Sequence, residues 1–246
     1  MTSALDFSGK TVLVVGGSSG IGNGMAQAFR GAGAEVFVWG TRAAAADYAG
    51  EAGSDMEGLH YACMDVADST KVEAYAAPFG KLDVLVLCQG TVIYGRGEFE
   101  HAGWDRVMDV NLNSVMWTAS HFRPMLAAAG GAVIIVSSIA AFRATIGNPA
   151  YNASKAGAAA LTRTLGAAWI GEGIRVNGIA PGLVDTKLTQ ATTAQPKRLD
   201  AALRTIPARR MGTPLDMAGV AMFLASDLAA YVVGQTITVD GGMTLA

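Results

Sequence analysis

Seven short runs of apolar, mostly β-branched residues alternate along the chain with longer segments whose apolar positions recur at helical spacing. The apolar runs span residues 11–16, 35–40, 58–66, 82–88, 132–138, 174–180 and 235–240, and the helical patterns span 20–32, 68–79, 101–129, 151–171 and 214–226. Pro124 is expected to interrupt the third helical pattern. Because almost continuously apolar strands are typical of sheets buried on both faces, the chain is predicted to have an α/β fold, with a doubly wound, seven-stranded parallel sheet and helices on both faces.

The composition fits one domain over residues 1–246 and excludes several classes of partner. Lys and Arg number 18 against 20 Asp and Glu, a formal net charge of −2, so no basic surface is expected to bind nucleic acid or an anionic membrane. The longest apolar stretch, near residues 126–136, is shorter than the ~20 residues that a membrane-spanning helix needs. The first ten residues do not resemble a secretory signal, so a cytoplasmic location is expected.

The cysteines and histidines give no metal-binding pattern. Cys63 and Cys88 lie in apolar segments and are interpreted as reduced core residues. The three histidines are dispersed, with no spacing that brings ligands together. No metal site is therefore expected.

A glycine-rich segment follows the first predicted strand and begins the first predicted helix. Gly16, Gly20 and Gly22 stand at the spacing Gly-x-x-x-Gly-x-Gly. In this context backbone N–H groups and the helix N-terminus can bind a pyrophosphate. A structural turn without a ligand is the alternative interpretation.

An acid/base site is indicated by Tyr151 and Lys155, four residues apart, with Ser138 thirteen residues before the tyrosine. Residues at i and i+4 share one face of a helix, so the ammonium of Lys155 is expected to lower the pKa of the Tyr151 phenol from about 10. Taken separately, the serine fits a loop cap, the tyrosine a half-buried aromatic residue, and the lysine a solvated one. It is the combination behind a nucleotide-binding pattern that favours catalysis.

Together, these motifs resemble the short-chain dehydrogenase/reductase family over essentially the whole chain, and its compact 3-oxoacyl reductases in particular. Further matches occur in the family's order: Asp65-Val66, Asn111, Pro181-Gly182 and the VDGG segment at 239–242. The resemblance implies a Rossmann fold and an NAD(P)-dependent oxidoreductase that acts on a small ketone or secondary alcohol. A 3-oxoacyl-thioester reductase and a non-catalytic dinucleotide-sensing protein are the alternatives.

The resemblance also assigns roles to individual residues. Ser138 would bind the substrate oxygen, Tyr151 would act as general acid/base, and Lys155 and Asn111 would support proton transfer. The residues expected to bind the cofactor are Gly16, Ser18, Ser19, Gly20, Ile21, Gly22, Thr41, Arg42, Asp65, Val66, Gly90, Tyr151, Lys155, Pro181, Gly182, Val184 and Thr186. Two departures remove hydrogen-bonding side chains: Val15 replaces a threonine, and Leu87-Cys88-Gln89-Gly90 replaces Asn-Asn-Ala-Gly.

Cofactor choice depends on the end of the second strand, where NAD-specific relatives place an acidic residue. This chain has Thr41 and Arg42 there instead, and arginine pairs well with a phosphate. NADP(H) is therefore favoured, with NAD(H) as the alternative. Against this, Ser19 stands where many NADP-dependent relatives have a basic residue, and Arg42 also fits a solvated position at a helix start.

Segment 187–213 corresponds to the mobile substrate lid of related proteins. Candidate substrate-lining residues by similarity are Val92, Tyr94, Ile139, Phe142, Ile146 and Leu188. They favour an uncharged or partly apolar carbonyl compound. Basic residues of the segment offer contacts to an acidic acyl carrier, namely Lys187, Arg198, Arg209 and Arg210. The Ala- and Gly-rich helix at 151–170 corresponds to a dimer contact in relatives, so the resemblance implies a homotetramer.

Overall fold

Seven strands form one parallel sheet in the computed structural model, which describes residues 5–245, in the order β3-β2-β1-β4-β5-β6-β7. The strands are β1 (Thr11–Val15), β2 (Glu35–Gly40), β3 (His60–Cys63), β4 (Val84–Leu87), β5 (Ala132–Val136), β6 (Arg175–Pro181) and β7 (Thr236–Val239). Each corresponds to one of the seven predicted runs, with β6 extending one residue beyond 174–180, and the predicted fold class is confirmed. The strand order reverses between β1 and β4, which is where doubly wound sheets bind their ligands.

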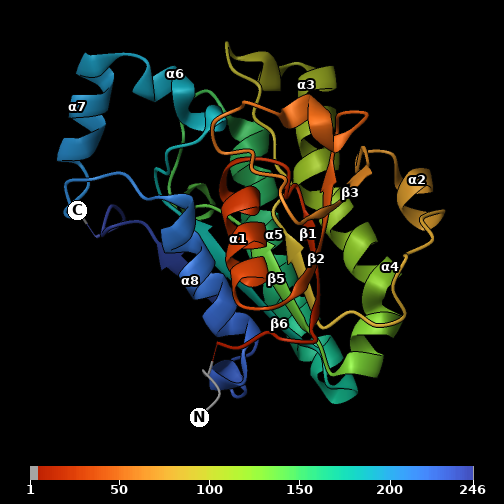
Figure 1. The fold of residues 1–246 in the computed structure, drawn as a ribbon. Coiled ribbons are helices and arrows are strands. Elements are labelled where there is room, and N and C mark those ends of the chain that lie inside the picture. Colours follow the sequence, from red (N-terminus) through yellow and green to blue (C-terminus); the bar gives the residue numbers. More distant parts are fainter. Residues whose placement is uncertain (1–4, 246) are drawn as a thin grey trace.

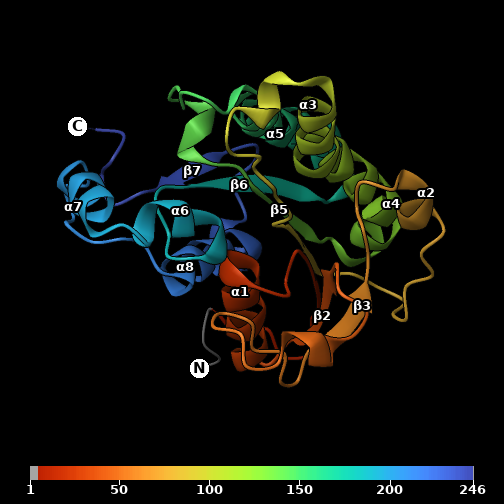
Figure 2. The same ribbon diagram turned by 90° about the horizontal axis from the view of Figure 1, so that it is seen from above.

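Two layers of helices cover the sheet (Figures 1 and 2). On one face, α1 (Gly20–Gly31) and α8 (Pro214–Ala225) bury Met25, Phe29 and Leu224 in one hydrophobic core. The other face carries α3 (His101–Met108), α4 (Ser114–Ala129) and α5 (Pro149–Trp169), whose Phe122 and Leu165 belong to a second core. The strands are buried between these layers, as their apolar sequences require.

The helical pattern at 101–129 is continuous but contains two kinds of helix. A π-helical turn, Asp109–Asn113, joins α3 to α4. Pro124 lies inside α4 without ending it, so the expected interruption at this residue was wrong. Phe122 and Leu126 on either side of the proline are fully buried against the sheet, and this packing offsets the hydrogen bond that proline cannot make.

The predicted helix at 68–79 is much shorter in the structure. Only Ser69–Glu73 is helical, as α2, with the Asp68 side chain capping its start. The following residues leave the helix, and Tyr75 and Phe79 pack against the core instead. Their rings contact Trp39 and Phe37 of β2 at centroid distances of 4.8 and 4.7 Å. Aromatic burial therefore overrides the helical pattern here.

The expected core placement fits Cys88, which packs against a hydrophobic core, but not Cys63. Both are free thiols, but Cys63 is exposed, so its assignment to the core was wrong. It ends β3, which pairs only with β2 at the edge of the sheet. Cys88 is half-buried because it lines a cavity.

Two kinds of feature are absent from residues 5–245. Within this range, no helix has both the length and the apolarity needed to cross a membrane. The same residues contain no cluster of three or more His, Cys, Asp or Glu side chains suited to holding a metal ion.

Candidate active site

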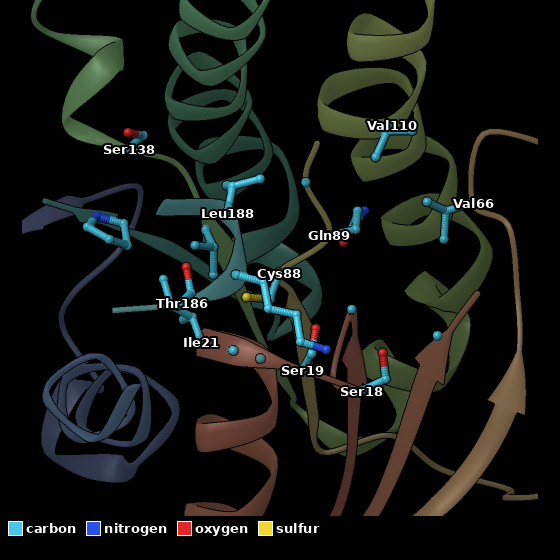
Figure 3. A pocket seen from close by; sticks show the side chains of 18 of the residues that line it. Ser18, Ser19, Ile21, Val66, Cys88, Gln89, Val110, Ser138, Thr186 and Leu188 are labelled. Atoms are coloured by element: carbon cyan, nitrogen blue, oxygen red, sulfur yellow. The ribbon is translucent and has the colours of Figure 1, made fainter. Parts of the chain in front are cut away.

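A cavity of about 370 Å³ lies at the carboxyl ends of the strands (Figure 3). Thr186 and Leu188 stand on one side of it, Val66 and Val110 on the other, and Ser18 and Ser19 lie near the start of α1. The predicted site residues that line it are Gly16, Ser18, Ser19, Gly20, Ile21, Gly22, Thr41, Asp65, Val66, Gly90, Ser138, Tyr151, Lys155, Pro181, Gly182, Val184 and Thr186. Arg42 and Asn111 do not line it.

The glycine loop requires glycine for two different reasons. Gly16 has φ +75°, and a Cβ there would lie 2.9 Å from the backbone N of Gln89. A Cβ on Gly22 would lie 2.2 Å from the carbonyl oxygen of Gly16, so the loop could not close. Ser19 precedes α1 without a side-chain cap, which leaves N–H groups of the first turn for an anion. The loop therefore fits the pyrophosphate of a dinucleotide.

Ser138, Tyr151 and Lys155 meet at one cavity because β5 ends beside the first turns of α5. The Ser138 Oγ accepts a hydrogen bond from the Ala140 N–H at 3.1 Å, and the Ser138 side chain also forms a hydrogen bond with Tyr151. Lys155 is buried and donates to the carbonyl oxygen of Val136 at 2.9 Å. Its Nζ lies 5.9 Å from the centroid of the Tyr151 ring.

The electrostatics of this group differ from the sequence-based expectation. Burial raises the pKa of Tyr151 above its ordinary value, opposed by a hydrogen bond with Ser138, so the expected lowering was wrong for this arrangement. Burial also lowers the pKa of Lys155 to about 8. Both shifts have one cause, because a low-dielectric site disfavours the charged form of each group. At neutral pH Tyr151 is therefore a protonated phenol, the form that can donate a proton.

Asn111 is fully buried in the π-helical turn, where it forms hydrogen bonds with segments next to the site. Its Oδ1 accepts from the Thr91 N–H at 2.7 Å, and its Nδ2 donates to the Thr91 carbonyl oxygen at 2.9 Å and to Ser154 Oγ at 3.2 Å. These bonds tie the segment after β4 to α5. A role for Asn111 in proton supply stays a prediction.

Arg42 is engaged by neighbours that the sequence pattern did not reveal. Its guanidinium donates to the Glu51 carboxylate and to the Asp47 carbonyl oxygen, and it stacks over the Tyr48 ring at 4.5 Å. Glu51 also pairs with Lys187, which lines the cavity. Glu51 therefore joins the end of β2 to the segment after β6. No motif marks it, because the contact forms only when these segments fold together.

The sequence pattern also gave no indication of Glu98, a buried carboxylate that contacts the backbone of Tyr151. It is fully buried, and its Oε2 accepts from the backbone N–H of Tyr151 at 2.9 Å. Its Oε1 accepts from Asn148 Nδ2 and from the Ile93 N–H, each at 3.1 Å. A carboxylate at the N-terminus of α5 satisfies backbone donors there and fixes the turn that carries Tyr151.

The two departures from the family pattern have a structural counterpart. Val15 is fully buried in the apolar core. Gln89 lines the cavity, and its Nε2 donates to Ser114 Oγ at 2.9 Å. This bond ties the end of β4 to the start of α4. A link between sheet and helix is thus present, but through a different side chain.

Further cavity residues that the sequence did not indicate include Arg106 and Trp39. The Arg106 guanidinium lies 3.4 Å from the Asp65 carboxylate. Arg106 and Asp65 are 41 positions apart in the sequence, so no local sequence pattern reveals that they pair.

Of the six predicted substrate-lining residues, Leu188 lines the cavity, whereas Val92, Tyr94, Ile139, Phe142 and Ile146 do not. Phe142 and Ile146 are exposed, the latter at 98%. The Tyr94 hydroxyl donates to the Leu188 carbonyl oxygen at 2.8 Å, joining the loop after β4 to the segment after β6.

Most of the basic residues expected to meet an acidic carrier are engaged within the chain. Lys187 pairs with Glu51, and Arg210 pairs with Asp216 at 2.7 Å. Arg209 donates to the carbonyl oxygen of Arg204 at 2.8 Å.

Comparison with known proteins gives consistent matches over nearly the full length. The family model described as enoyl-(acyl carrier protein) reductase matches residues 15–244. A 3-oxoacyl-[acyl-carrier-protein] reductase of Chlamydia muridarum is 36% identical over 95% of this chain and 97% of its own length. A 2-dehydro-3-deoxy-D-gluconate 5-dehydrogenase of Pseudoalteromonas atlantica is 37% identical over 98% of each chain.

Solved structures agree with these matches. A putative 2-deoxy-D-gluconate 3-dehydrogenase from Agrobacterium tumefaciens, with bound NADP, has a TM-score of 0.88 at 36% identity and covers 99% of this chain and 100% of its own. A gluconate 5-dehydrogenase from Burkholderia cenocepacia, in complex with NADP and tartrate, has a TM-score of 0.88 at 32% identity with the same coverage.

Proposed function

The chain belongs to the short-chain dehydrogenase/reductase family, and we propose that it transfers a hydride between a nicotinamide cofactor and a ketone or secondary alcohol. The observation that carries the proposal is geometric. Ser138, Tyr151 and Lys155 line the same cavity as the glycine loop. A non-catalytic dinucleotide-sensing protein would need no such polar group beside its ligand.

In the reductive direction, the protein supplies orientation and a proton. A nicotinamide cofactor, which the glycine loop Gly16–Gly22 would hold by its pyrophosphate, would supply the hydride for the carbonyl carbon. Ser138 donates a hydrogen bond to the substrate oxygen and so stabilises the negative charge that develops there. Tyr151, protonated at neutral pH, transfers its phenolic proton to that oxygen and yields the alcohol. Lys155, whose pKa is about 8, and Asn111 behind it support return of a proton to Tyr151.

The direct test is a substrate panel of simple ketones, sugar acids and 3-oxoacyl thioesters, followed by absorbance of NADPH and NADH. We expect turnover of at least one carbonyl class, with the alcohol as product. Tight cofactor binding without turnover of any class would instead favour the sensing protein. Binding measured on the same preparation separates these two results from a failure of the cofactor site.

A 3-oxoacyl-thioester reductase is the second candidate within this reaction class. It is favoured by the 36% identity with the Chlamydia muridarum reductase. Against it, Lys187 and Arg210 are already engaged in ion pairs within the chain. Comparing a carrier-bound thioester with the corresponding small thioester distinguishes the cases, because a carrier-dependent enzyme should strongly prefer the former.

We propose NADP(H) as the preferred cofactor, with NAD(H) as the alternative, and this choice gives a prediction for Arg42. Replacing Arg42 by alanine should weaken NADPH binding by about 10–100-fold, as expected for loss of a charge-assisted hydrogen bond of ~1.5–3 kcal/mol, and leave NADH binding nearly unchanged. Fluorescence titration measures both affinities. Equal weakening for NADPH and NADH would reject a 2′-phosphate role.

The matched variant for this experiment is Glu51→Gln. In the structure the Glu51 carboxylate holds both Arg42 and Lys187, so a 2′-phosphate must compete with it. Removing its negative charge should strengthen NADPH binding and leave NADH binding unaffected. Opposite effects of the two variants would establish that both act through the same phosphate.

We propose that residues 187–213 act as the substrate lid of a single domain spanning 1–246. The segment contains α6 (Gln190–Thr193) and α7 (Pro196–Arg204), and α7 lies at the periphery, away from the sheet (Figure 1). The Tyr94–Leu188 and Glu51–Lys187 contacts join the start of the segment to the main body. Hydrogen exchange of this segment should slow when cofactor and substrate bind.

We further propose a homotetramer and a cytoplasmic location. Trp104 of α3 and Trp117 of α4 are both exposed, which supports an apolar contact between subunits on this side. Light scattering should give a mass near four times 25.2 kDa. Cell fractionation should recover the protein in the cytoplasmic fraction.

A further inference from the structure

Gln89 occupies the crevice where the strand order reverses. It is the second residue after β4, and its backbone N would lie 2.9 Å from a Cβ placed on Gly16 of the glycine loop. Its side chain lies between Cys88 and Val110 in the view of the cavity (Figure 3). This residue therefore stands at the junction of the two halves of the sheet, which is where a dinucleotide crosses it.

A directional hydrogen-bond chain fixes the orientation of the Gln89 amide. The Ser114 hydroxyl donates its single proton to the Val110 carbonyl oxygen at 2.6 Å. Ser114 Oγ can then only accept, and it accepts from Gln89 Nε2 at 2.9 Å. With the amide reversed, the Gln89 oxygen would face an oxygen that has no proton to offer. The carbonyl oxygen, Oε1, must therefore point away from Ser114.

This oxygen has no hydrogen-bond partner within the described part of the chain, although Gln89 is only 5% exposed. Leaving a buried acceptor unpaired costs ~1–3 kcal/mol, so a donor is expected from elsewhere. Trp39 lines the same cavity, and its buried indole N–H also lacks a partner among residues 5–245. A polar ligand group in this part of the cavity is therefore indicated.

Resting on the proposed function, we propose that Gln89 Oε1 accepts a hydrogen bond from the 3′-hydroxyl of the adenosine ribose in the bound cofactor. Phosphate oxygens cannot donate, whereas ribose hydroxyls can. Gln89 abuts the phosphate loop, and Val110, which accepts a hydrogen bond from the Gln89 partner Ser114, lines the cavity with Val66 on the side expected to hold adenine. The 3′-hydroxyl is the hydroxyl of this ribose that remains free when the 2′ position carries a phosphate.

The test compares ADP with 3′-deoxy-ADP by isothermal titration calorimetry. Wild-type protein should bind the deoxy compound about 5–10-fold more weakly, as expected for one neutral hydrogen bond of ~1 kcal/mol. Gln89→Met should lose this discrimination because it keeps the length of the side chain and removes the acceptor. It should also weaken NADPH and NADH binding equally, unlike Arg42→Ala.

Controls keep the result interpretable. Gln235→Met makes the same chemical change at an exposed residue outside the cavity, and should leave the discrimination intact. If Gln89→Met does not fold, the wild-type comparison still decides, because equal binding of ADP and 3′-deoxy-ADP overturns the proposal. Weakened binding of NADH alone by Gln89→Met would also overturn it. If either of these two results overturned the proposal for Gln89 while wild-type protein still bound NADPH and turned over its substrate, the proposed function would be unaffected.

Discussion

Turnover is expected to fall by about 10²–10⁴-fold when Tyr151 is replaced by phenylalanine, the range usually supplied by a positioned general acid. The variant keeps the ring at the start of α5 and removes only the hydroxyl that holds the transferable proton. Affinity for NADPH should change little, because the glycine loop and the ends of β3 and β6 are untouched. Steady-state kinetics on the best substrate and a fluorescence titration measure the two quantities.

Tyr231→Phe is the matched control for this prediction. Tyr231 is fully exposed and does not line the cavity, so losing its hydroxyl should leave both turnover and affinity unchanged. Wild-type turnover in Tyr151→Phe would contradict the assigned role of the phenol. A parallel loss of NADPH binding would show that the substitution disturbs the cofactor site instead.

Replacing Lys155 by methionine is expected to reduce activity and increase stability at the same time. Turnover should fall by at least about 10²-fold, because the group that supports proton return to Tyr151 is lost. The lowering of the Lys155 pKa from 10.5 to about 8 corresponds to ~3 kcal/mol of penalty for a buried ammonium. Loss of the donor to the Val136 carbonyl oxygen offsets part of the gain, by ~1 kcal/mol. The free energy of unfolding at pH 7 should therefore rise by ~2 kcal/mol.

The stability gain of Lys155→Met is expected to depend on pH. Below pH 8 the lysine is protonated in both folded and unfolded chains, and the folded chain bears the full penalty. Between pH 8 and 10.5 the lysine is protonated in the unfolded chain but not in the folded chain. The free energy of unfolding of the wild-type protein therefore rises with pH over this range. The advantage of Lys155→Met should accordingly shrink as pH increases through this range. Urea unfolding at several pH values measures it.

Lys71→Met serves as the control for stability. Lys71 is largely exposed and pairs with Asp68 at the surface, at the start of α2, so its removal should change the free energy of unfolding by less than ~1 kcal/mol at any pH. A destabilised Lys155→Met protein at pH 7 would contradict the charge-burial account. It would mean that the bond to Val136 outweighs the desolvation of the ammonium.

The strands and the glycine loop could be predicted because their signals are local. Buried parallel strands require short apolar runs, and a loop closing over its own backbone requires glycine at positions such as Gly22. Where the local sequence pattern and tertiary packing favoured different helix boundaries, the structure follows the packing. The helix predicted at 68–79 ends early so that Tyr75 and Phe79 reach the core, and the helix through Pro124 continues because its neighbours are buried.

The sequence by itself determined the fold class, the order of its elements, and the identity of the Ser138, Tyr151 and Lys155 group. These follow from residue types at fixed spacing along single helices, strands and turns. The tertiary structure alone decided the partners of Arg42, the carboxylate of Glu98 beneath Tyr151, and the orientation of the Gln89 amide. It also decided the direction of the Tyr151 pKa, because burial depends on everything that surrounds the phenol, whereas spacing along a helix reports only its nearest neighbours.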